Sequence, residues 1–139
     1  MPNEASGAGW IHDHKPITVS IPPGTAQVSS VLSLPMGFRE AIVGIRAVVK
    51  VAATGAGASR VLNFRRGSAS GTVIATTTYV LADGATVGSF KVIPMSAGDA
   101  DFLDGDTLTI EWPTAGAVAF TAGELTFIIY TRKRVQQRN

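Results

Sequence analysis

Residues 106–112 (DTLTIEW) and 124–131 (ELTFIIYT) are the two stretches of sequence that decide the fold. In the first, Leu108, Ile110 and Trp112 alternate with polar residues, as in a half-buried β-strand. The two stretches are the clearest of about eight short strand-like runs, each bounded by Gly, Pro, Asp or Ala-Gly. Runs of this length and spacing predict an all-β fold, either an antiparallel β-sandwich or a barrel, and we expect the β-sandwich.

The second stretch is apolar on both of its faces. Leu125, Phe127 and Ile129 share one face of the expected strand, and Ile128 and Tyr130 share the other. A strand that is apolar on both faces is covered on both faces. In one small sandwich the outer cover would most simply be another subunit, so we expect Ile128 and Tyr130 at a subunit interface. The alternative is a stable monomer with a Thr-rich surface.

Two other runs define the expected core. Residues 41–51 form the longest run, and alternation places five apolar side chains on its inward face: Val43, Ile45, Ala47, Val49 and Val51. The same pattern places Phe90 and Val92 on the inward face of a later strand.

The chain divides into an arm, one domain and a short tail. Residues 1–15 (MPNEASGAGWIHDHK) show no period, so we expect an extended N-terminal arm anchored by Trp10 and Ile11. Residues 16–133 form the expected β-sandwich domain, and residues 134–139 form a basic C-terminal tail.

Composition excludes several classes of chemistry. The 139 residues include no cysteine, which excludes disulfides, Cys-ligated zinc and thiol nucleophiles. Charged residues make up 16% of the chain against a usual ~25%, so much of the surface must be Thr, Ser and Ala. No apolar stretch approaches the ~18–20 residues of a membrane span, and no secretory signal pattern is present. We therefore expect a soluble protein without a membrane partner.

The net charge of +2 gives little support for nucleic-acid binding. Arg60, Arg65 and Arg66 lie close to Phe64 and would suit a stacking and phosphate surface. Phe64, however, falls on the inward face by alternation. The other basic concentration is in the last eight residues, where a short tail is more often simply solvated. Nucleic acid is not an expected partner.

Both histidines occur in one short motif, His12-Asp13-His14. An imidazole–carboxylate group can hold a metal or transfer protons. In an extended segment, however, His12 and His14 point one way and Asp13 points the other, so the three groups do not converge. We expect no metal and no cofactor there.

Four carboxylates cluster in one loop, at Asp99, Asp101, Asp104 and Asp106. Clustered carboxylates suit Ca²⁺, but the spacing does not match an EF-hand. Asp also caps turns by accepting hydrogen bonds from nearby backbone N–H groups, and we favour that interpretation. Whether the loop binds a cation stays open. No nucleophile, metalloprotease or phosphate-loop motif appears elsewhere, so we expect no enzyme.

Three aromatic residues support an alternative function. Tyr79, Trp112 and Tyr130 would suit a sugar-stacking platform, as in β-sandwich lectins. They lie in strands of mixed facing, where core packing or an interface is the commoner use of aromatic residues. A carbohydrate- or receptor-binding module of a virion is therefore the second hypothesis.

Over residues 17–133 the chain resembles small β-sandwich structural proteins of tailed bacteriophages, especially head decoration (cement) proteins. The resemblance rests on the N-terminal arm, a long strand of small residues and three segments: ITVSIPPGTAQVSSVLSLP at 17–35, LADGATVGSFKVIP at 81–94 and FLDGDTLTIEWPTAGAVAFTAGELTFIIYTRKR at 102–134. The likeness lies in the general character of the sequence and in the order of its expected strands, and no motif matches residue for residue.

The resemblance implies a jelly-roll-like sandwich that often trimerises and sits on the outer surface of a capsid. It implies a virion structural protein, made in the host cytoplasm, whose partner is the major capsid protein. The arm is then the expected element of capsid contact, through Trp10, Ile11, His12 and His14.

Overall fold

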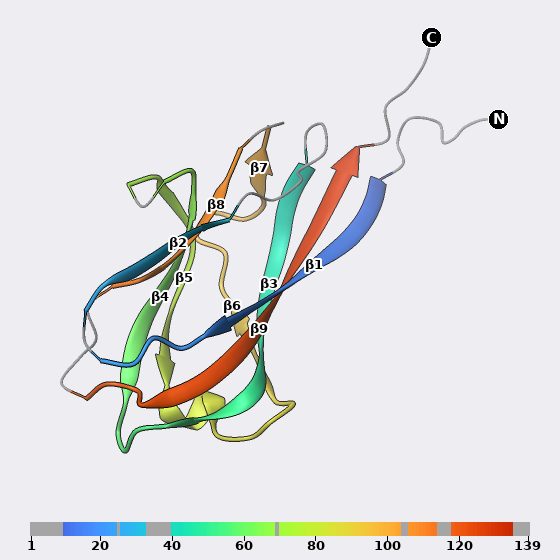
Figure 1. Cartoon of the computed structure of the whole chain (residues 1–139). Helices are drawn as coiled ribbons and strands as arrows, with labels where there is room; N and C mark the ends of the chain where they lie inside the picture. Colours follow the sequence, from blue (N-terminus) through green and yellow to red (C-terminus); the bar gives the residue numbers. More distant parts are fainter. Residues whose placement is uncertain are drawn as a thin grey trace, which may run out of the picture.

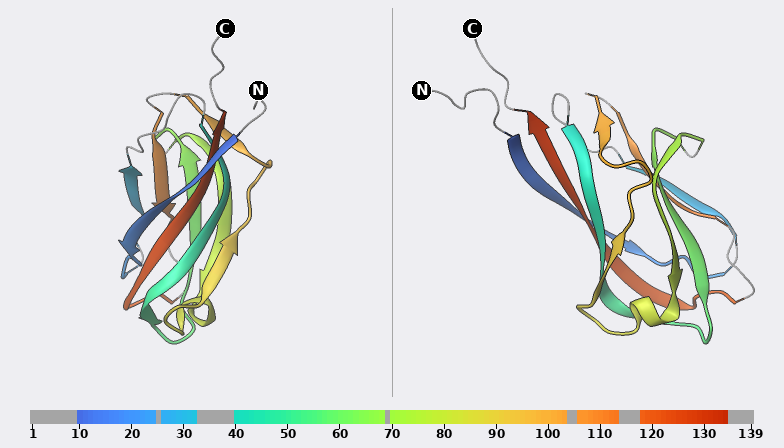
Figure 2. Two further views of the ribbon diagram at one scale, coloured as in Figure 1. Left: turned by 90° about the vertical axis from the view of Figure 1, so that its right-hand side faces the viewer. Right: turned by 180° about the vertical axis from the view of Figure 1, so that it is seen from behind.

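The computed structural model describes residues 10–24, 26–32, 40–68, 70–103, 106–113 and 118–134. They form two antiparallel sheets that pack face to face (Figures 1 and 2). The five-stranded sheet has the order β1-β9-β3-β6, with β7 also paired to β3, and its strands are β1 (Trp10–Ser20), β9 (Ala122–Arg134), β3 (Glu40–Thr54), β6 (Phe90–Ile93) and β7 (Ala100–Phe102). The four-stranded sheet has the order β2-β8-β4-β5, and its strands are β2 (Val28–Leu32), β8 (Leu108–Trp112), β4 (Ser59–Arg66) and β5 (Thr72–Val80). The predicted all-β sandwich is confirmed.

The strand order is that of a jelly roll. Strands β6 and β7 both pair with β3, at Ile45–Val48 and Glu40–Ile42, and so act as one interrupted strand. If β6 and β7 are counted together as strand 6, β8 becomes strand 7 and β9 becomes strand 8. The sheets then have the orders 1-8-3-6 and 2-7-4-5, the two interlocking Greek keys of a jelly roll. The short 3₁₀ turn η2 (Leu81–Gly84) follows β5. Within the described ranges, no helix is long and apolar enough to cross a membrane.

The core lies between the sheets and follows the alternation of β8 and β9. Leu108, Ile110 and Trp112 face inward from β8, and Leu125, Phe127 and Ile129 meet them from β9; all six are buried. The ring of Phe127 lies 5.1 Å from that of Phe64, edge to face, and 6.4 Å from that of Trp112. Burying each such side chain stabilises the fold by about 1.5–3 kcal/mol.

Strand β3 departs from strict alternation where its pairing with β9 is irregular. The pairing shifts between Ile42 and Gly44, between Val49 and Val51, and between Val51 and Thr54. As a result Ile42 is fully buried and Val43 is only partly buried, while Val51 is 48% exposed. The predicted inward positions of Val43 and Val51 are therefore wrong, because a bulge moves the following side chains to the other face.

The first strand begins earlier than the sequence suggested. Strand β1 pairs with β9 over its whole length, from Trp10 opposite Arg134 to Ser20 opposite Glu124. Residues 10–15, expected in the N-terminal arm, are therefore part of the five-stranded sheet, because β9 is long enough to pair with them. Residues 1–9 and 135–139 lie outside the described residues, and with them most of the expected arm and tail.

Candidate functional site

The middle of the outer face of the five-stranded sheet carries a patch of apolar residues. Tyr130 and Ile128 alternate with the buried residues of β9 and so face away from the core. Cross-strand pairing adds residues of β1, β3 and β6 to the same face. We call this patch the outer apolar face; it consists of Pro16, Val48, Phe90, Val92, Ile128 and Tyr130 around the charged Arg46. The hydrogen-bonded pair Thr18 and Thr126 borders it on the same side of the sheet.

Phe90 and Val92 contribute the most exposed apolar side chains of this face. They are 55% and 56% exposed, whereas the neighbouring Ile93 is buried. The sequence predicted both of them on the inward face, and that prediction is wrong. The run FKVI is apolar at three of its four positions, so its pattern alone fixes neither face.

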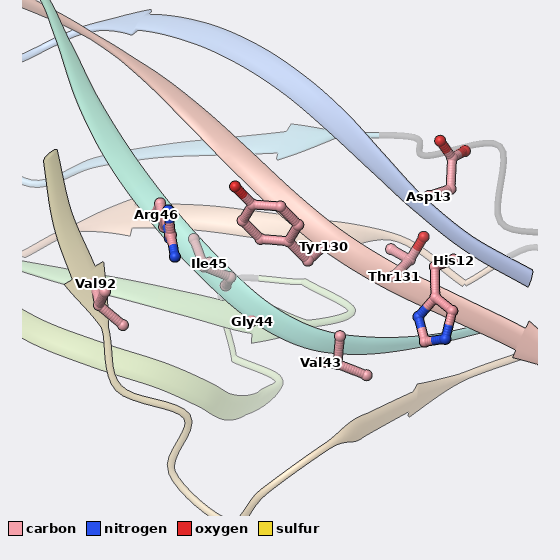
Figure 3. A pocket seen from close by; sticks show the side chains of 9 residues that line it. All are labelled: His12, Asp13, Val43, Gly44, Ile45, Arg46, Val92, Tyr130 and Thr131. Carbon is pink, nitrogen blue, oxygen red and sulfur yellow. The ribbon is translucent and has the colours of Figure 1, made fainter. Parts of the chain in front are cut away.

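Arg46 is held between two aromatic rings at the centre of the face. Its guanidinium carbon lies 4.7 Å from the ring centroid of Phe90 and 5.6 Å from that of Tyr130. Both distances are within the ~6 Å over which a cation is attracted to the face of a ring. Arg46 and Tyr130 extend from the neighbouring strands β3 and β9 (Figure 3).

A hollow of about 430 Å³ lies beside Arg46. It forms where β3 bulges, and Gly44 of that bulge pairs with Tyr130. A Cβ at Gly44 would lie 3.9 Å from the Cδ2 atom of Tyr130, an ordinary van der Waals distance, so the ring lies beside Gly44 with room for a methyl group between them. Figure 3 shows the lining residues, which are His12, Asp13, Val43, Gly44, Ile45, Arg46, Val92, Tyr130 and Thr131.

The residues predicted for capsid contact and for the subunit interface meet on this one sheet. His14 pairs with Tyr130, and their ring centroids are 6.5 Å apart. His12 and His14 are exposed and share the outward-facing row of β1 with Pro16. The side chains of Trp10 and Ile11 lie outside the described part of the structure, although their backbone belongs to β1.

Asp13 points to the other side of β1 from the two histidines, as expected for an extended segment. Its carboxylate accepts a hydrogen bond from the His14 N–H at 2.8 Å and lies 3.8 Å from the Lys15 ammonium. Among the described residues, no group of three or more His, Cys, Asp or Glu could hold a metal ion.

The acidic loop caps a turn at Asp106. Its carboxylate accepts a hydrogen bond from the Leu103 N–H at 2.9 Å. Asp99 forms an ion pair with Arg132 at 2.7 Å. Asp101 is exposed, and Asp104 lies outside the described residues.

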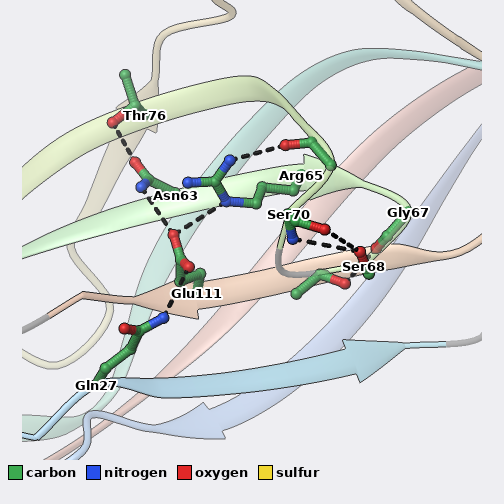
Figure 4. Close-up of polar contacts among 10 residues, drawn as sticks. Gln27, Asn63, Arg65, Gly67, Ser68, Ser70, Thr76 and Glu111 are labelled. Atoms are coloured by element: carbon green, nitrogen blue, oxygen red, sulfur yellow. Dashed lines mark hydrogen bonds and ion pairs between the residues drawn. The ribbon is translucent and has the colours of Figure 1, made fainter.

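The outer face of the four-stranded sheet is polar and hydrogen-bonded across its strands (Figure 4). Its centre is Glu111, which is only 4% exposed. Asn63 and Arg65 donate to one oxygen of Glu111 at 3.1 and 3.0 Å, and Gln27 donates to the other at 3.0 Å. Thr76 extends this network to β5 by donating to Asn63 at 2.6 Å. The polar side chains of this network therefore already have partners within the fold.

These hydrogen bonds control the ionisation of Glu111. Burial by itself raises the pKa of a carboxyl group, but the hydrogen bonds from Asn63, Arg65 and Gln27 and the charge of Arg65 outweigh it. The pKa of Glu111 therefore lies below its ordinary value.

The structure does not bring the alternative binding residues together. Tyr79 and Trp112 are buried in the core, so they form no sugar-stacking platform with Tyr130. Burial, followed by the charge of Asp83, raises the pKa of Tyr79 to about 12.

The three arginines considered for nucleic acid are likewise engaged within the fold. Arg60 is buried and donates to main-chain oxygens, Arg65 pairs with Glu111, and Arg66 donates to the Asp101 carbonyl at 2.9 Å. The main-chain partners of Arg60 are Pro22, Gly24, Ala26, Trp112 and Pro113.

Comparison with known proteins gives no family. No protein-family model matches the chain, and no curated protein matches it. One similar solved structure comes from Bacillus endospore appendages, described as a family of disulfide-linked pili; it has 15% identity and a TM-score of 0.41, over 98% of this chain and 99% of that one. Another comes from infectious bursal disease virus, Gx strain, with 12% identity and a TM-score of 0.25, over 89% of this chain and 37% of that one. The phage decoration family expected from the sequence is not shown by these comparisons.

Proposed function

We propose that the chain is a virion structural protein that binds the outer surface of an assembled bacteriophage capsid and stabilises it. The observation that carries this proposal is the contrast between the two outer faces of the sandwich. The four-stranded sheet presents a hydrogen-bonded polar surface around Glu111, whereas the outer apolar face presents Phe90 and Val92 more than half exposed. An exposed apolar patch of this kind is typical of a surface that docks on another protein.

A capsid is a suitable partner for such a surface. A protein that binds only the assembled shell stabilises it by mass action, since every bound copy opposes expansion or rupture. A shell repeats each site many times, so modest contacts of one copy can stabilise the whole. The major capsid protein is the partner we propose, and the capsid surface is the proposed location.

We place the shell contact on the outer apolar face together with His12 and His14. Ile128 and Tyr130 share that face, so the two contact sets predicted from the sequence become one surface in this proposal. Assembly into trimers remains a prediction. Light scattering would detect a trimer as a mass of about 43 kDa, three times the 14.4 kDa of one chain.

Co-sedimentation with phage heads tests the proposal. The chain should bind saturably to mature heads, stripped of decoration, of the phage that encodes it, and should raise the temperature at which those heads release DNA. Absence of saturable binding would contradict the proposal. Val92→Asp places a charge on the outer apolar face and should weaken binding to the heads by about tenfold or more. Thr78→Asp is the matched control, because Thr78 is exposed on β5 of the other sheet and should bind like wild type.

The contribution of the N-terminal residues needs a shorter deletion than residues 1–15. Removing residues 1–15 would also remove six residues of β1, including Asp13 and Lys15 with their ion pair. Deletion of residues 1–9 leaves β1 intact. Loss of head binding in that variant would show that these nine residues contribute to the contact.

A further inference from the structure

Arg46 differs from the other described cations in its partners. Most described Lys and Arg side chains pair with a carboxylate: Lys15 with Glu40, Lys50 with Glu124, Arg65 with Glu111, Lys91 with Asp83 and Arg132 with Asp99. Arg60 and Arg66 donate to main-chain oxygens instead. Among described side chains, Arg46 and Lys133 have neither kind of partner, and Arg46 is the one held by aromatic rings.

The rings hold the guanidinium in position without using its donors. The guanidinium carbon of Arg46 lies over the ring faces of Phe90 and Tyr130, and this cation–π attraction does not require hydrogen bonds from its N–H groups. Those N–H groups form a planar fork that matches two oxygens of a carboxylate. Because the side chain is already restricted, it loses less conformational entropy when an anion binds.

The hollow beside Arg46 is lined in part by apolar side chains and has room for a side chain of a partner. Val43, Val92 and the ring of Tyr130 form its apolar walls, His12, Asp13 and Thr131 complete the lining, and its volume is about 430 Å³. An ion pair formed against such walls is less hydrated than one on an open polar surface, which strengthens its attraction.

We infer that Arg46 receives a carboxylate side chain of the shell protein, from a segment that also places apolar side chains on the outer apolar face. This inference rests on the proposed function and specifies the chemistry of its partner. A carboxylate fits better than the phosphates of a nucleic acid, because phosphate surfaces use several free cations. The nearby cations Lys50 and Arg132 are already paired with carboxylates.

A peptide titration tests the carboxylate site without a capsid. The probe is acetyl-Leu-Glu-Leu-amide, with acetyl-Leu-Gln-Leu-amide as its neutral counterpart, followed by the ¹H–¹⁵N signals of the Gly44 amide and the Arg46 side chain. The Glu peptide should shift both signals saturably, and the Gln peptide should bind roughly tenfold more weakly. Arg46→Gln should lose the preference for Glu, and Arg46→Lys should keep only part of it. Lys50→Gln, a change on the same strand at a cation that is already paired, should retain the preference.

Three results of this titration would overturn the inference. They are an equal response to both peptides, no response at Gly44 and Arg46, and tighter binding of inorganic phosphate than of the Glu peptide at the same signals.

Binding to phage heads distinguishes a failure of this inference from a failure of the proposed function. If heads bind wild type and Arg46→Gln equally, the inference fails and the proposed function stands. If the Glu peptide binds as expected but no heads bind, the carboxylate site stands and the shell is excluded as its source. A wild-type trimer that dissociates on Arg46→Gln would place the carboxylate on a second copy of the chain, and would also overturn the shell as the source.

Discussion

Phe127 and Ile128 are consecutive in β9 and lie on opposite faces of the five-stranded sheet. Phe127 is fully buried, with its ring 5.1 Å from that of Phe64. Ile128 is paired with Pro16 on one side and with Arg46 on the other, in a row on the outer apolar face. One strand therefore supplies both the centre of the core and the centre of the proposed docking surface.

Alanine substitution should separate these two roles. Phe127→Ala removes a ring from the packed core and should lower the free energy of unfolding by about 3–5 kcal/mol. Ile128→Ala leaves the core intact and should lower it by less than about 1 kcal/mol, while weakening binding to phage heads. Urea denaturation and co-sedimentation measure the two effects. A stable Phe127→Ala variant, or an Ile128→Ala variant with full head binding, would contradict the assignment.

Glu111 should make stability depend on pH under acidic conditions. Its pKa is lowered in the folded state, so the unfolded chain binds more protons between that pKa and the ordinary value of about 4.3. The stabilisation is therefore complete above about pH 5 and is lost as the pH falls through the folded-state pKa.

Glu111→Gln tests this dependence. The variant should be less stable than wild type by about 1.5–3 kcal/mol at pH 7, because charge-assisted hydrogen bonds are lost. The difference should narrow as the pH falls toward 3. Urea denaturation between pH 7 and pH 3 measures the free energy of unfolding of both proteins. A difference between them that stays constant with pH would show that Glu111 does not cause the loss of stability in acid.

Arg60 should be required for stability although it lies far from the outer apolar face. It joins the segment after β1 to the end of β8 by donating to Pro22 and Gly24 at 3.1 Å and to Pro113 at 3.2 Å. Arg60→Met leaves buried carbonyls without donors and should cost about 2–4 kcal/mol. Arg60→Lys should not restore this, because an ammonium lacks the planar fork of donors. Arg66→Met is the control at an exposed position, and an equal loss of stability in both Met variants would contradict this role.

The free edge of β1 should resist pairing with other strands. Pro16 has no N–H, and the N–H of His14 is bonded to the Asp13 carboxylate at 2.8 Å. The N–H of Ile21 donates to the Gly123 carbonyl, toward β9. Because successive N–H groups of a strand point to opposite sides, the N–H groups of the even-numbered residues of β1 point to the free edge. Two neighbouring donors of that edge are thus removed, a common protection against edge-to-edge association.

A double substitution tests the protection of this edge. Asp13→Ala with Pro16→Val should fold but self-associate at lower concentrations than wild type, as measured by light scattering. Pro23→Val, outside β1, is the control and should behave like wild type. If the double variant stays as dispersed as wild type, the edge is protected by other means.

The fold could be predicted from the sequence because the alternation is regular where the core is formed. Leu108, Ile110 and Trp112 of β8 and Leu125, Phe127 and Ile129 of β9 lie on the predicted face. The positions of Val43 and Val51 could not be predicted, since bulges depend on the pairing of β3 with β9 and leave no clear local pattern.

The candidate site was predicted only in part. The apolar pattern of β9 identified Ile128 and Tyr130 as outward-facing. The sequence did not reveal that His14 pairs with Tyr130, because the register of two strands over a hundred residues apart is not a local property. Arg46 was missed because its environment is assembled from β3, β6 and β9. The one available signal was an arginine with apolar neighbours on both sides in the run IVGIRAVV of β3.

The most direct test of the central claim is a cryo-electron microscopy reconstruction of phage heads saturated with the chain. We expect density for each copy with the outer apolar face toward the shell, Phe90 and Val92 in contact with it, and the Glu111 surface toward solvent. Density with the four-stranded sheet against the shell, or heads without added density, would contradict it.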